Sequence, residues 1–178
     1  MSRFVFLDRD GTLVADAGYT HRLADYALLP GVVEGLTRLQ GAGFGLAIVT
    51  NQSGIGRGFY DEAAYAAFQQ HLEADLARQG IAIARSYHCP HAPAAGCACR
   101  KPEPGLVLRA RDELGATLAE SFVVGDGAGD VELATRAGCR GAVWIRPEGA
   151  PADARRPEVA QARDLREAAE RILSATRS

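Results

Sequence analysis

The sequence predicts an α/β protein, a parallel β-sheet with helices on both faces. Short apolar segments rich in strand-forming residues alternate along the chain with longer segments of helical periodicity. Polar residues that can do chemistry directly follow several of the apolar segments, and ligands bind at that end of parallel strands. The length suits one domain with one core, and we expect residues 1–178 to form it, since no linker or internal repeat divides them.

Each expected strand is a short apolar run that ends at an acidic, glycine-containing or otherwise polar segment. The expected strands cover residues 4–7, 45–49, 81–87, 122–124 and 142–145. Because helical segments separate them, the crossover connections are those of parallel strands.

Five other segments repeat apolar residues every three or four positions, as amphipathic helices do. They cover residues 32–39, 61–79, 104–114, 131–137 and 164–173. Asp61 is the expected N-cap of the longest helix, and Pro104 stands in a first turn, where helices favour proline. Gly138 is the expected end of the fourth helix. The Pro- and Ala-rich segment 147–157 is expected to form a surface loop.

Composition and charge argue against several classes of partner. The formal net charge is −2, so no basic field favours nucleic acid or an anionic membrane. No apolar run approaches the ~20 residues that span a bilayer, and the short apolar N-terminus does not resemble a signal peptide. We therefore expect a cytoplasmic monomer with no nucleic-acid or membrane partner. Thiols stay reduced there, so the four cysteines are not read as disulfides.

The hexapeptide DRDGTL at positions 8–13 directly follows the first expected strand. Asp8 and Asp10 repel each other at such close spacing, and a divalent cation would relieve that repulsion. One carboxylate can attack phosphorus while the other serves as acid and base. Strand alternation would separate their side chains, but the loop that begins here can turn both toward a cleft. The alternative is a solvated turn, in which Asp and Gly are common.

This hexapeptide resembles the first motif of haloacid dehalogenase-like hydrolases, and the other motifs of that superfamily follow in order. Thr50 after Ala-Ile-Val resembles the second, Lys101 in Arg-Lys-Pro the third, and Asp126 in Val-Val-Gly-Asp the fourth. The match covers residues 3–145 and implies a three-layer Rossmann-like fold. Members often carry a cap domain after the first or second motif. The intervals here leave no room for one, so we expect a capless enzyme.

The resemblance also implies a two-step phosphatase mechanism. Asp8 would be the nucleophile that forms an aspartyl phosphate, and Asp10 the general acid and then the general base. Thr50 and Lys101 would hold the phosphoryl oxygens, where charge accumulates. Asp8, Asp126 and the backbone carbonyl of Asp10 would bind Mg²⁺ through oxygen atoms.

A second cluster lies in the loop of residues 88–100. Cys89, His91, Cys97 and Cys99 form two pairs of metal-binding residues, a set suited to a tetrahedral zinc site. Four protein ligands leave no open position, so this Zn²⁺ would be structural. The alternative is a flexible loop with free thiols.

Two residues beside these clusters keep more than one interpretation. Asp130 is either the N-cap of the fourth expected helix or a residue that supports the metal site without being part of its motif. His88 could replace His91 as a zinc ligand, although we expect it at the end of a strand.

Two glycine-rich segments imitate nucleotide-binding motifs. Residues 125–129 have the third glycine one position too early for a dinucleotide fingerprint, and the expected ribose-binding acid is absent. Residues 54–58 lack the lysine and hydroxyl of a P-loop. We expect the latter to be a mobile loop over the active site, with Arg57 available to a second anionic group.

The cysteine loop that runs into Arg-Lys-Pro narrows the resemblance to two groups. They are the D-glycero-D-manno-heptose 1,7-bisphosphate 7-phosphatases and the histidinol-phosphate phosphatases. The segment NQSGIGRG at 51–58 and the pattern Asp-x-Gly-Tyr-x-His at 16–21 resemble the heptose group. The implied substrate-binding residues are Asn51, Arg57, Arg100, Tyr19 and His21, with both arginines on a second phosphate, since a guanidinium grips phosphate in two places.

One position departs from the heptose group. Gly127 stands where those enzymes often carry a lysine, so sugar contacts near the metal differ. The resemblance implies a product, heptose 1-phosphate, that feeds nucleotide-activated heptose for lipopolysaccharide. Two alternatives are a histidinol-phosphate phosphatase and a non-catalytic zinc module that binds phosphosugars. The latter would lack Asp8 or Asp10, and both are present.

Overall fold

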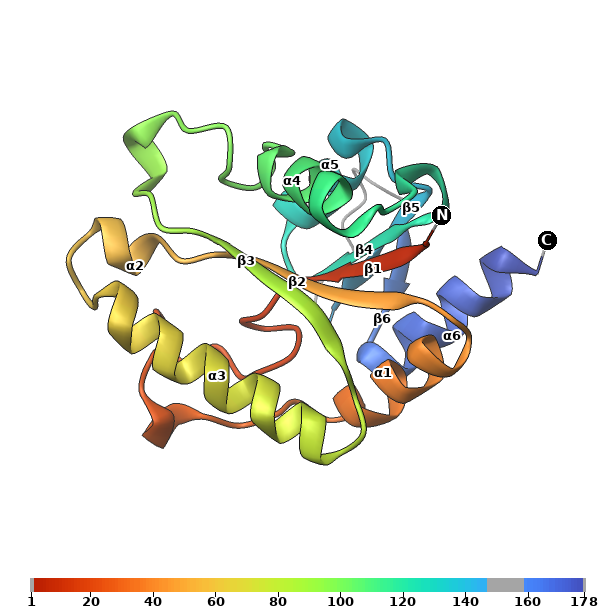
Figure 1. Ribbon diagram of the computed structural model, residues 1–178, viewed down its shortest axis with the longest axis horizontal. Coiled ribbons are helices and arrows are strands. Elements are labelled where there is room, and N and C mark those ends of the chain that lie inside the picture. Colours follow the sequence, from red (N-terminus) through yellow and green to blue (C-terminus); the bar gives the residue numbers. More distant parts are fainter. Residues whose placement is uncertain (1, 147–158, 178) are drawn as a thin grey trace.

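The computed structural model describes residues 2–146 and 159–177, and in this part of the chain six parallel strands form one sheet (Figure 1). The strand order is β3-β2-β1-β4-β5-β6. The strands are β1 (Phe4–Leu7), β2 (Gly45–Asn51), β3 (Ile83–Cys89), β4 (Phe122–Gly125), β5 (Gly141–Ile145) and β6 (Ala160–Ala162). The predicted parallel sheet is confirmed, with β6 added at its edge.

Helices connect the strands in the predicted alternation. They are α1 (Val32–Gly41), α2 (Ser53–Gly56), α3 (Glu62–Arg78), α4 (Gly105–Leu114), α5 (Ala128–Ala137) and α6 (Leu165–Thr176). Short 3-10 turns occupy Leu23–Asp25, Pro93–Ala95 and Leu118–Glu120. The side chain of Asp61 accepts a hydrogen bond from the Ala64 amide, so it caps α3 as predicted.

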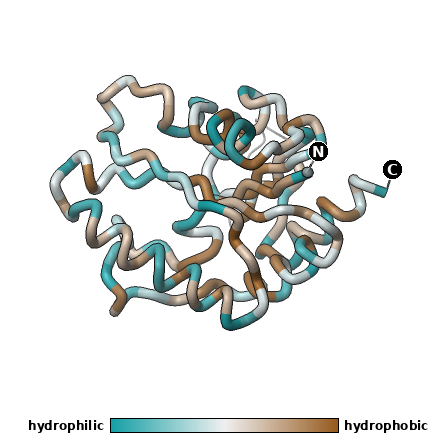
Figure 2. Tube along the Cα trace, in the orientation of Figure 1, coloured by the Kyte–Doolittle hydropathy of each residue, from teal (hydrophilic) through white to brown (hydrophobic). Residues whose placement is uncertain are grey.

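The side chains of the central strand alternate between two apolar layers. Val5 and Leu7 pack with residues of α1, α3 and α6, whereas Phe4 and Phe6 pack with residues of α4 and α5. Figure 1 shows α1 and α6 on one side of the sheet and α4 and α5 on the other. Figure 2 shows the central strands as largely apolar, while α3 alternates between polar and apolar residues. The three-layer architecture follows from this two-sided burial.

Several predicted element boundaries were wrong. The third strand was predicted at 81–87 but begins at Ile83, because the Ile81 amide still bonds to Leu76 O and closes α3. Residues 54–56 of the predicted loop belong to the short helix α2, and α5 begins at Ala128, ahead of the predicted 131. The predicted surface loop at 147–157 lies outside the described residues.

The sheet's order reverses beside β1. The chain runs from β1 to β2 and β3 on one side and then returns to β4, β5 and β6 on the other. Such a switch point opens a crevice at the carboxyl ends of the strands, here next to Asp8 and Asp126. Among the described residues the intervals after β1 and β2 hold helices and loops but no inserted domain, as a capless enzyme requires. None of the described helices has the length and apolar character to cross a membrane.

Candidate active site

A cleft of about 270 Å³ opens at the carboxyl ends of the strands. It brings together the side chains that the four sequence motifs contribute, from four separate parts of the chain. The predicted residues that line it are Asp8, Asp10, Thr50, Asn51, Lys101 and Asp126. Asp16, Gly127, Gly129 and Asp130 also line it. Most of its surface is polar, so it suits a charged ligand rather than an apolar one.

A tight turn after β1 presents the first motif to the cleft. Gly11 has a φ of 76°, and its amide donates to Val14 O over 2.8 Å. A Cβ atom at Gly11 would come within 2.1 Å of Asp126 Oδ2. Glycine is therefore required here both for the backbone conformation and for the close approach of the fourth motif.

Lys101 is buried between two carboxylates. Its Nζ lies 2.7 Å from Asp8 Oδ1 and 2.6 Å from Asp130 Oδ1. Burial lowers the pKa of Lys101, but the charges of Asp8 and Asp130 outweigh it and hold the pKa above its usual range. An ammonium group carries three N–H donors, so two can face these carboxylates while one remains for an anion.

Asn51 holds the backbone of Lys101 in place. Its Oδ1 accepts from the Lys101 amide over 3.0 Å, and its Nδ2 donates to the Lys101 carbonyl over 3.3 Å. This paired contact joins the end of β2 to the segment before α4. Asn51, predicted as a substrate contact, thus also positions the lysine.

Three carboxylates of the cleft lining lie close together. Oxygen atoms of Asp8, Asp126 and Asp130 lie within 4.8 Å of one another. Loss of hydration, together with the like charges of Asp8 and Asp130, raises the pKa of Asp126 to about 7. Such crowding of oxygen ligands fits a hard divalent cation such as Mg²⁺.

The interpretation of Asp130 as an N-cap is wrong. Gly127 is the N-cap residue of α5, and Asp130 is the third residue of that helix. Its Oδ2 accepts from the Gly127 amide over 3.1 Å while its other oxygen faces Lys101. Asp130 therefore stabilises the start of α5 and also belongs to the charged cluster.

Sequence reasoning missed the environment of Asp10. Burial raises the pKa of Asp10, and the neighbouring Arg9 opposes that rise. Arg9 is fully buried and donates to both carboxylate oxygens of Asp10. A charged residue between two acids in a loop is ordinarily solvated, and the sequence carries no signal of its burial.

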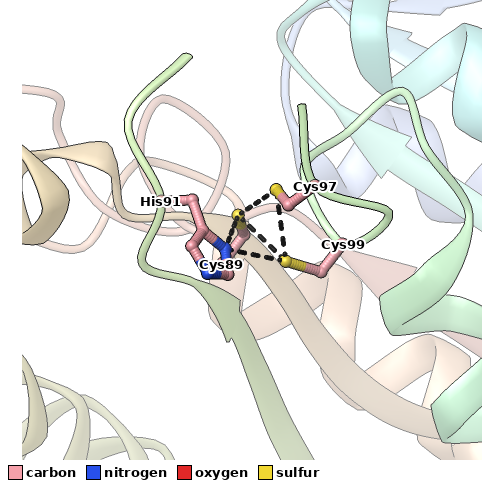
Figure 3. A group of neighbouring side chains, drawn as sticks. All are labelled: Cys89, His91, Cys97 and Cys99. Atoms are coloured by element: carbon pink, nitrogen blue, oxygen red, sulfur yellow. Dashed lines mark hydrogen bonds between the residues drawn. The ribbon is translucent and has the colours of Figure 1, made fainter. Parts of the chain in front are cut away.

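The cysteine cluster converges from two segments of chain (Figure 3). The Sγ atom of Cys89 lies 3.6 Å from that of Cys97 and 3.3 Å from that of Cys99. His91 Nδ1 is 3.2 Å from Cys99 Sγ. These separations are far too long for disulfides and close to the ~3.8 Å ligand spacing of a tetrahedral thiolate zinc site. The donor set therefore fits Zn²⁺, as the spacing predicted.

Comparison with known proteins decides the family. A family model described as HAD-hydrolase-like matches residues 98–168. The D-glycero-beta-D-manno-heptose-1,7-bisphosphate 7-phosphatase of Photorhabdus laumondii is 40% identical over 149 residues, 80% of this chain and 79% of the relative. The protein of that name from Escherichia coli K12 is 38% identical over 149 residues, 80% and 78% of the two chains.

This chain belongs to the heptose-bisphosphate phosphatase family of haloacid dehalogenase-like hydrolases. The D,D-heptose 1,7-bisphosphate phosphatase of B. bronchiseptica, solved with magnesium and phosphate, agrees in fold with a TM-score of 0.84. The two are 30% identical, and the match covers 97% of this chain and 99% of the other.

Four predicted substrate-binding residues do not line the cleft. They are Tyr19, His21, Arg57 and Arg100. Tyr19 is exposed, has an unusual positive φ of 57° and contacts the ring of Phe59 edge-on at 4.7 Å. His21 stacks on Tyr60 with 4.4 Å between ring centroids. These residues form an aromatic rim near the cleft.

The two arginines predicted to bind a second phosphate differ in their surroundings. Arg57 is exposed, and within the described residues its side chain has no hydrogen-bond or ion-pair partner. Arg100 is half-buried, and its Nη1 is buried without a partner in the same part of the chain. A buried donor left unpaired is costly unless a ligand satisfies it.

Proposed function

We propose that this chain is a magnesium-dependent phosphatase that removes the 7-phosphate of D-glycero-D-manno-heptose 1,7-bisphosphate. The observation that carries the proposal is the convergence of Asp8, Asp10, Thr50 and Lys101 in one polar cleft of a chain in this family. We also propose that residues 1–178 act as one catalytic domain.

In the first step, a carboxylate oxygen of Asp8 attacks phosphorus and the bond from phosphorus to the sugar oxygen breaks. The leaving oxygen takes a proton from Asp10. Thr50 and Lys101 hold the non-bridging oxygens, and the position of Lys101 Nζ beside the attacking carboxylate of Asp8 supports this role. The products are the sugar alcohol and an aspartyl phosphate on Asp8.

In the second step, water attacks phosphorus and Asp10 accepts a proton from that water. The bond from phosphorus to Asp8 then breaks, which releases inorganic phosphate and restores the free carboxylate. One group thus serves as acid and then as base.

Two metals have separate places in this proposal. Asp8 and Asp126, with the backbone carbonyl of Asp10, would hold Mg²⁺, which when bound neutralises the crowded carboxylates and the charge of the phosphoryl group. The four side chains of the cysteine cluster would hold structural Zn²⁺. The donor types support this division, because oxygen ligands suit Mg²⁺ and thiolates suit Zn²⁺.

The second phosphate of the substrate would lie beyond the reacting one. The unpaired Nη1 of Arg100 and the unpartnered guanidinium of Arg57 support a role for both in binding it. Tyr19 and His21, on the aromatic rim, would contact the sugar.

Phosphate release measured side by side tests the substrate. The substrates are the two anomers of heptose 1,7-bisphosphate and histidinol phosphate, with Asp8→Asn protein as the control for contaminating phosphatases. We expect kcat/KM for one bisphosphate anomer to exceed that for histidinol phosphate at least about a hundredfold. Preference for histidinol phosphate would reassign the substrate. Binding without release of phosphate from any substrate would make the chain a non-catalytic module.

A further inference from the structure

The side-chain amide of Gln52 forms hydrogen bonds through both its nitrogen and its oxygen beneath the cleft. It is only 2% exposed and is not among the residues that line the cleft. Its Nε2 donates to Asp10 Oδ2 and to Thr50 Oγ1, each over 2.8 Å. Its Oε1 accepts from Arg9 Nη2 over 3.1 Å and from the Tyr60 hydroxyl over 2.6 Å. One buried amide therefore links the proposed acid and base to the proposed phosphate-binding hydroxyl.

The chemistry of Arg9 fixes which way this amide points. A guanidinium can only donate, so the atom of Gln52 that faces it must be the oxygen. The amide nitrogen then necessarily faces Asp10 and Thr50. Because Thr50 Oγ1 accepts from this nitrogen, its own hydrogen remains free for a phosphoryl oxygen.

Arg9 is itself held rigidly. Its side chain is completely buried, and its Nη2 also donates to the carbonyl of Thr20 over 2.5 Å. The guanidinium carbon lies 4.7 Å from the centre of the Phe68 ring, in a cation–π contact. The guanidinium and the Gln52 amide together donate to both oxygens of Asp10, so that carboxyl group has little freedom to rotate.

Tyr60 supplies the last fixed point. A Cβ atom at position 54 would come within 2.1 Å of its ring, so Gly54 makes room for it. Stacking on His21 covers another part of the ring. Burial raises the pKa of Tyr60 to about 12, so its hydroxyl stays protonated and donates to Gln52.

We infer that Gln52, fixed by Arg9 and Tyr60, is a positioning residue that holds the Asp10 carboxyl group in place for both proton transfers and leaves the hydrogen of the Thr50 hydroxyl free for a phosphoryl oxygen. The inference rests on the roles proposed above for Asp8, Asp10 and Thr50. It assigns Gln52 no contact with substrate, because the residue acts through its two neighbours.

The choice of leaving group separates the two proton transfers. p-Nitrophenolate departs without a proton, so formation of the aspartyl phosphate from p-nitrophenyl phosphate needs little help from an acid. Hydrolysis of the aspartyl phosphate still needs Asp10 as a base. A variant with a misplaced Asp10 should therefore release its first p-nitrophenol normally and then stall.

The experiment compares Gln52→Met with Gln69→Met by rapid-quench kinetics on p-nitrophenyl phosphate. Gln69 is the matched control, because its buried amide bonds to Glu73 and Ser86, remote from the cleft lining. We expect Gln52→Met to keep first-turnover release within about threefold of wild type. Its steady-state rate should fall at least about thirtyfold, so that a burst of about one p-nitrophenol per chain appears.

Intact-protein mass spectrometry of the quenched samples should find a phosphoryl group on most Gln52→Met chains. Gln69→Met should show neither the burst nor this accumulation, whatever its thermal stability. Tyr60→Phe removes one donor to the amide and should show a smaller burst, and it carries the test if Gln52→Met fails to fold. Equal losses in both phases, or no loss in either variant, would overturn the inference.

Asp10→Asn separates this inference from the proposed mechanism. That variant lacks the base itself and should accumulate the phosphorylated chain from p-nitrophenyl phosphate. Absence of the phosphorylated chain in Asp10→Asn would refute the aspartyl-phosphate mechanism. Accumulation in Asp10→Asn but not in Gln52→Met would refute only the positioning role. The outcome does not depend on which sugar is the natural substrate.

Discussion

Two buried cations organise the residues around the cleft. Arg9 pairs with Asp10, and Lys101 pairs with Asp8 and Asp130. A buried charge is tolerated only when an opposite charge or hydrogen bonds compensate it. Removal of one partner leaves the other charge buried with its desolvation free energy uncompensated. Substitutions in this cluster must therefore preserve shape and leave each cation with a partner.

Asp8→Asn meets that condition and tests the nucleophile. It keeps the shape of the side chain, and Asp130 still faces Lys101. We expect turnover of p-nitrophenyl phosphate to fall below about a thousandth of wild type, because the attacking charge is lost. Circular dichroism should show an intact fold. Asp112→Asn, an exposed change on α4, is the matched control. Substantial activity in Asp8→Asn would contradict the covalent mechanism.

Arg57→Ala and Arg100→Ala test the second phosphate. Each removes a charge-assisted contact, so kcat/KM for heptose 1,7-bisphosphate should fall roughly ten- to a hundredfold. Activity on p-nitrophenyl phosphate, which has no second phosphate, should change little. Arg109→Ala, an exposed arginine paired with Glu113, should leave both substrates unaffected. Equal losses on both substrates would instead place the arginines at the reacting phosphate or in the fold.

At the scale of elements, the loop between β3 and α4 connects the cysteine cluster to Lys101. Cys89 ends β3, and Cys99 precedes Lys101 by two residues. The Gly105 amide at the start of α4 donates to Ala98 O over 3.0 Å. A metal that ties these segments together would therefore also restrain Lys101.

Elemental analysis tests the zinc site. After brief EDTA treatment and desalting, we expect about one zinc per chain and no magnesium, because thiolates hold zinc far more tightly than oxygens hold magnesium. Cys97→Ser should lose zinc, melt at a lower temperature and lose activity through Lys101. Cys139→Ser, outside the cluster, is the control. A wild-type protein without zinc, although made with ample zinc, would rule out the structural site.

The start of α6 gives a pH-dependent prediction. Hydrogen bonds from Arg163 and Arg171 lower the pKa of Glu167 to about 2, and the Glu167 amide donates to Asp164 Oδ1. Because the pKa of Glu167 is lower in the folded than in the unfolded chain, where it is ~4.3, the carboxylate stabilises the fold at pH values above ~4.3. This stabilisation is lost as the pH falls toward 2. Glu167→Gln should therefore unfold at lower temperature than wild type at pH 7, with a smaller difference at pH 3. Glu132→Gln on α5 is the control, and a pH-independent difference would contradict the assignment.

At the scale of the whole molecule, the topology places like charges together. Strands β1 and β4 are adjacent in the sheet but far apart in the chain, and each is followed by a carboxylate of the cleft. The two apolar layers on either side of the sheet hold these charges close despite their repulsion. The free energy of folding thus maintains a site that a cation would stabilise.

Asp126→Asn tests this balance between stability and function. It removes one of the three clustered carboxylates, so in magnesium-free buffer the variant should melt at or above the wild-type temperature. Saturating Mg²⁺ should raise the melting temperature of wild type by about 5 °C or more and that of the variant far less. Asp112→Asn should respond as wild type does. Equal shifts with Mg²⁺ in all three would place the cation elsewhere.

The sequence by itself determined the α/β class, the five principal strands and their succession along the chain, the four motifs and the cysteine set. Each of these depends on local information. The periodicity of apolar residues indicates which face of a helix or strand is buried. A short motif is recognised from the spacing of its residues within one segment. The N-cap at Asp61 is of the same kind, because the side chain and its amide partner are three residues apart.

Only the tertiary structure decided the features that need contacts across the chain. The burial of Arg9, the clamp of Asn51 on the Lys101 backbone and the four bonds of Gln52 all join separate elements. The existence of β6 likewise depends on its pairing with β5. The physical reason is that burial and hydrogen-bond partners across the sheet are set by packing, whereas composition and local propensity act only within a segment.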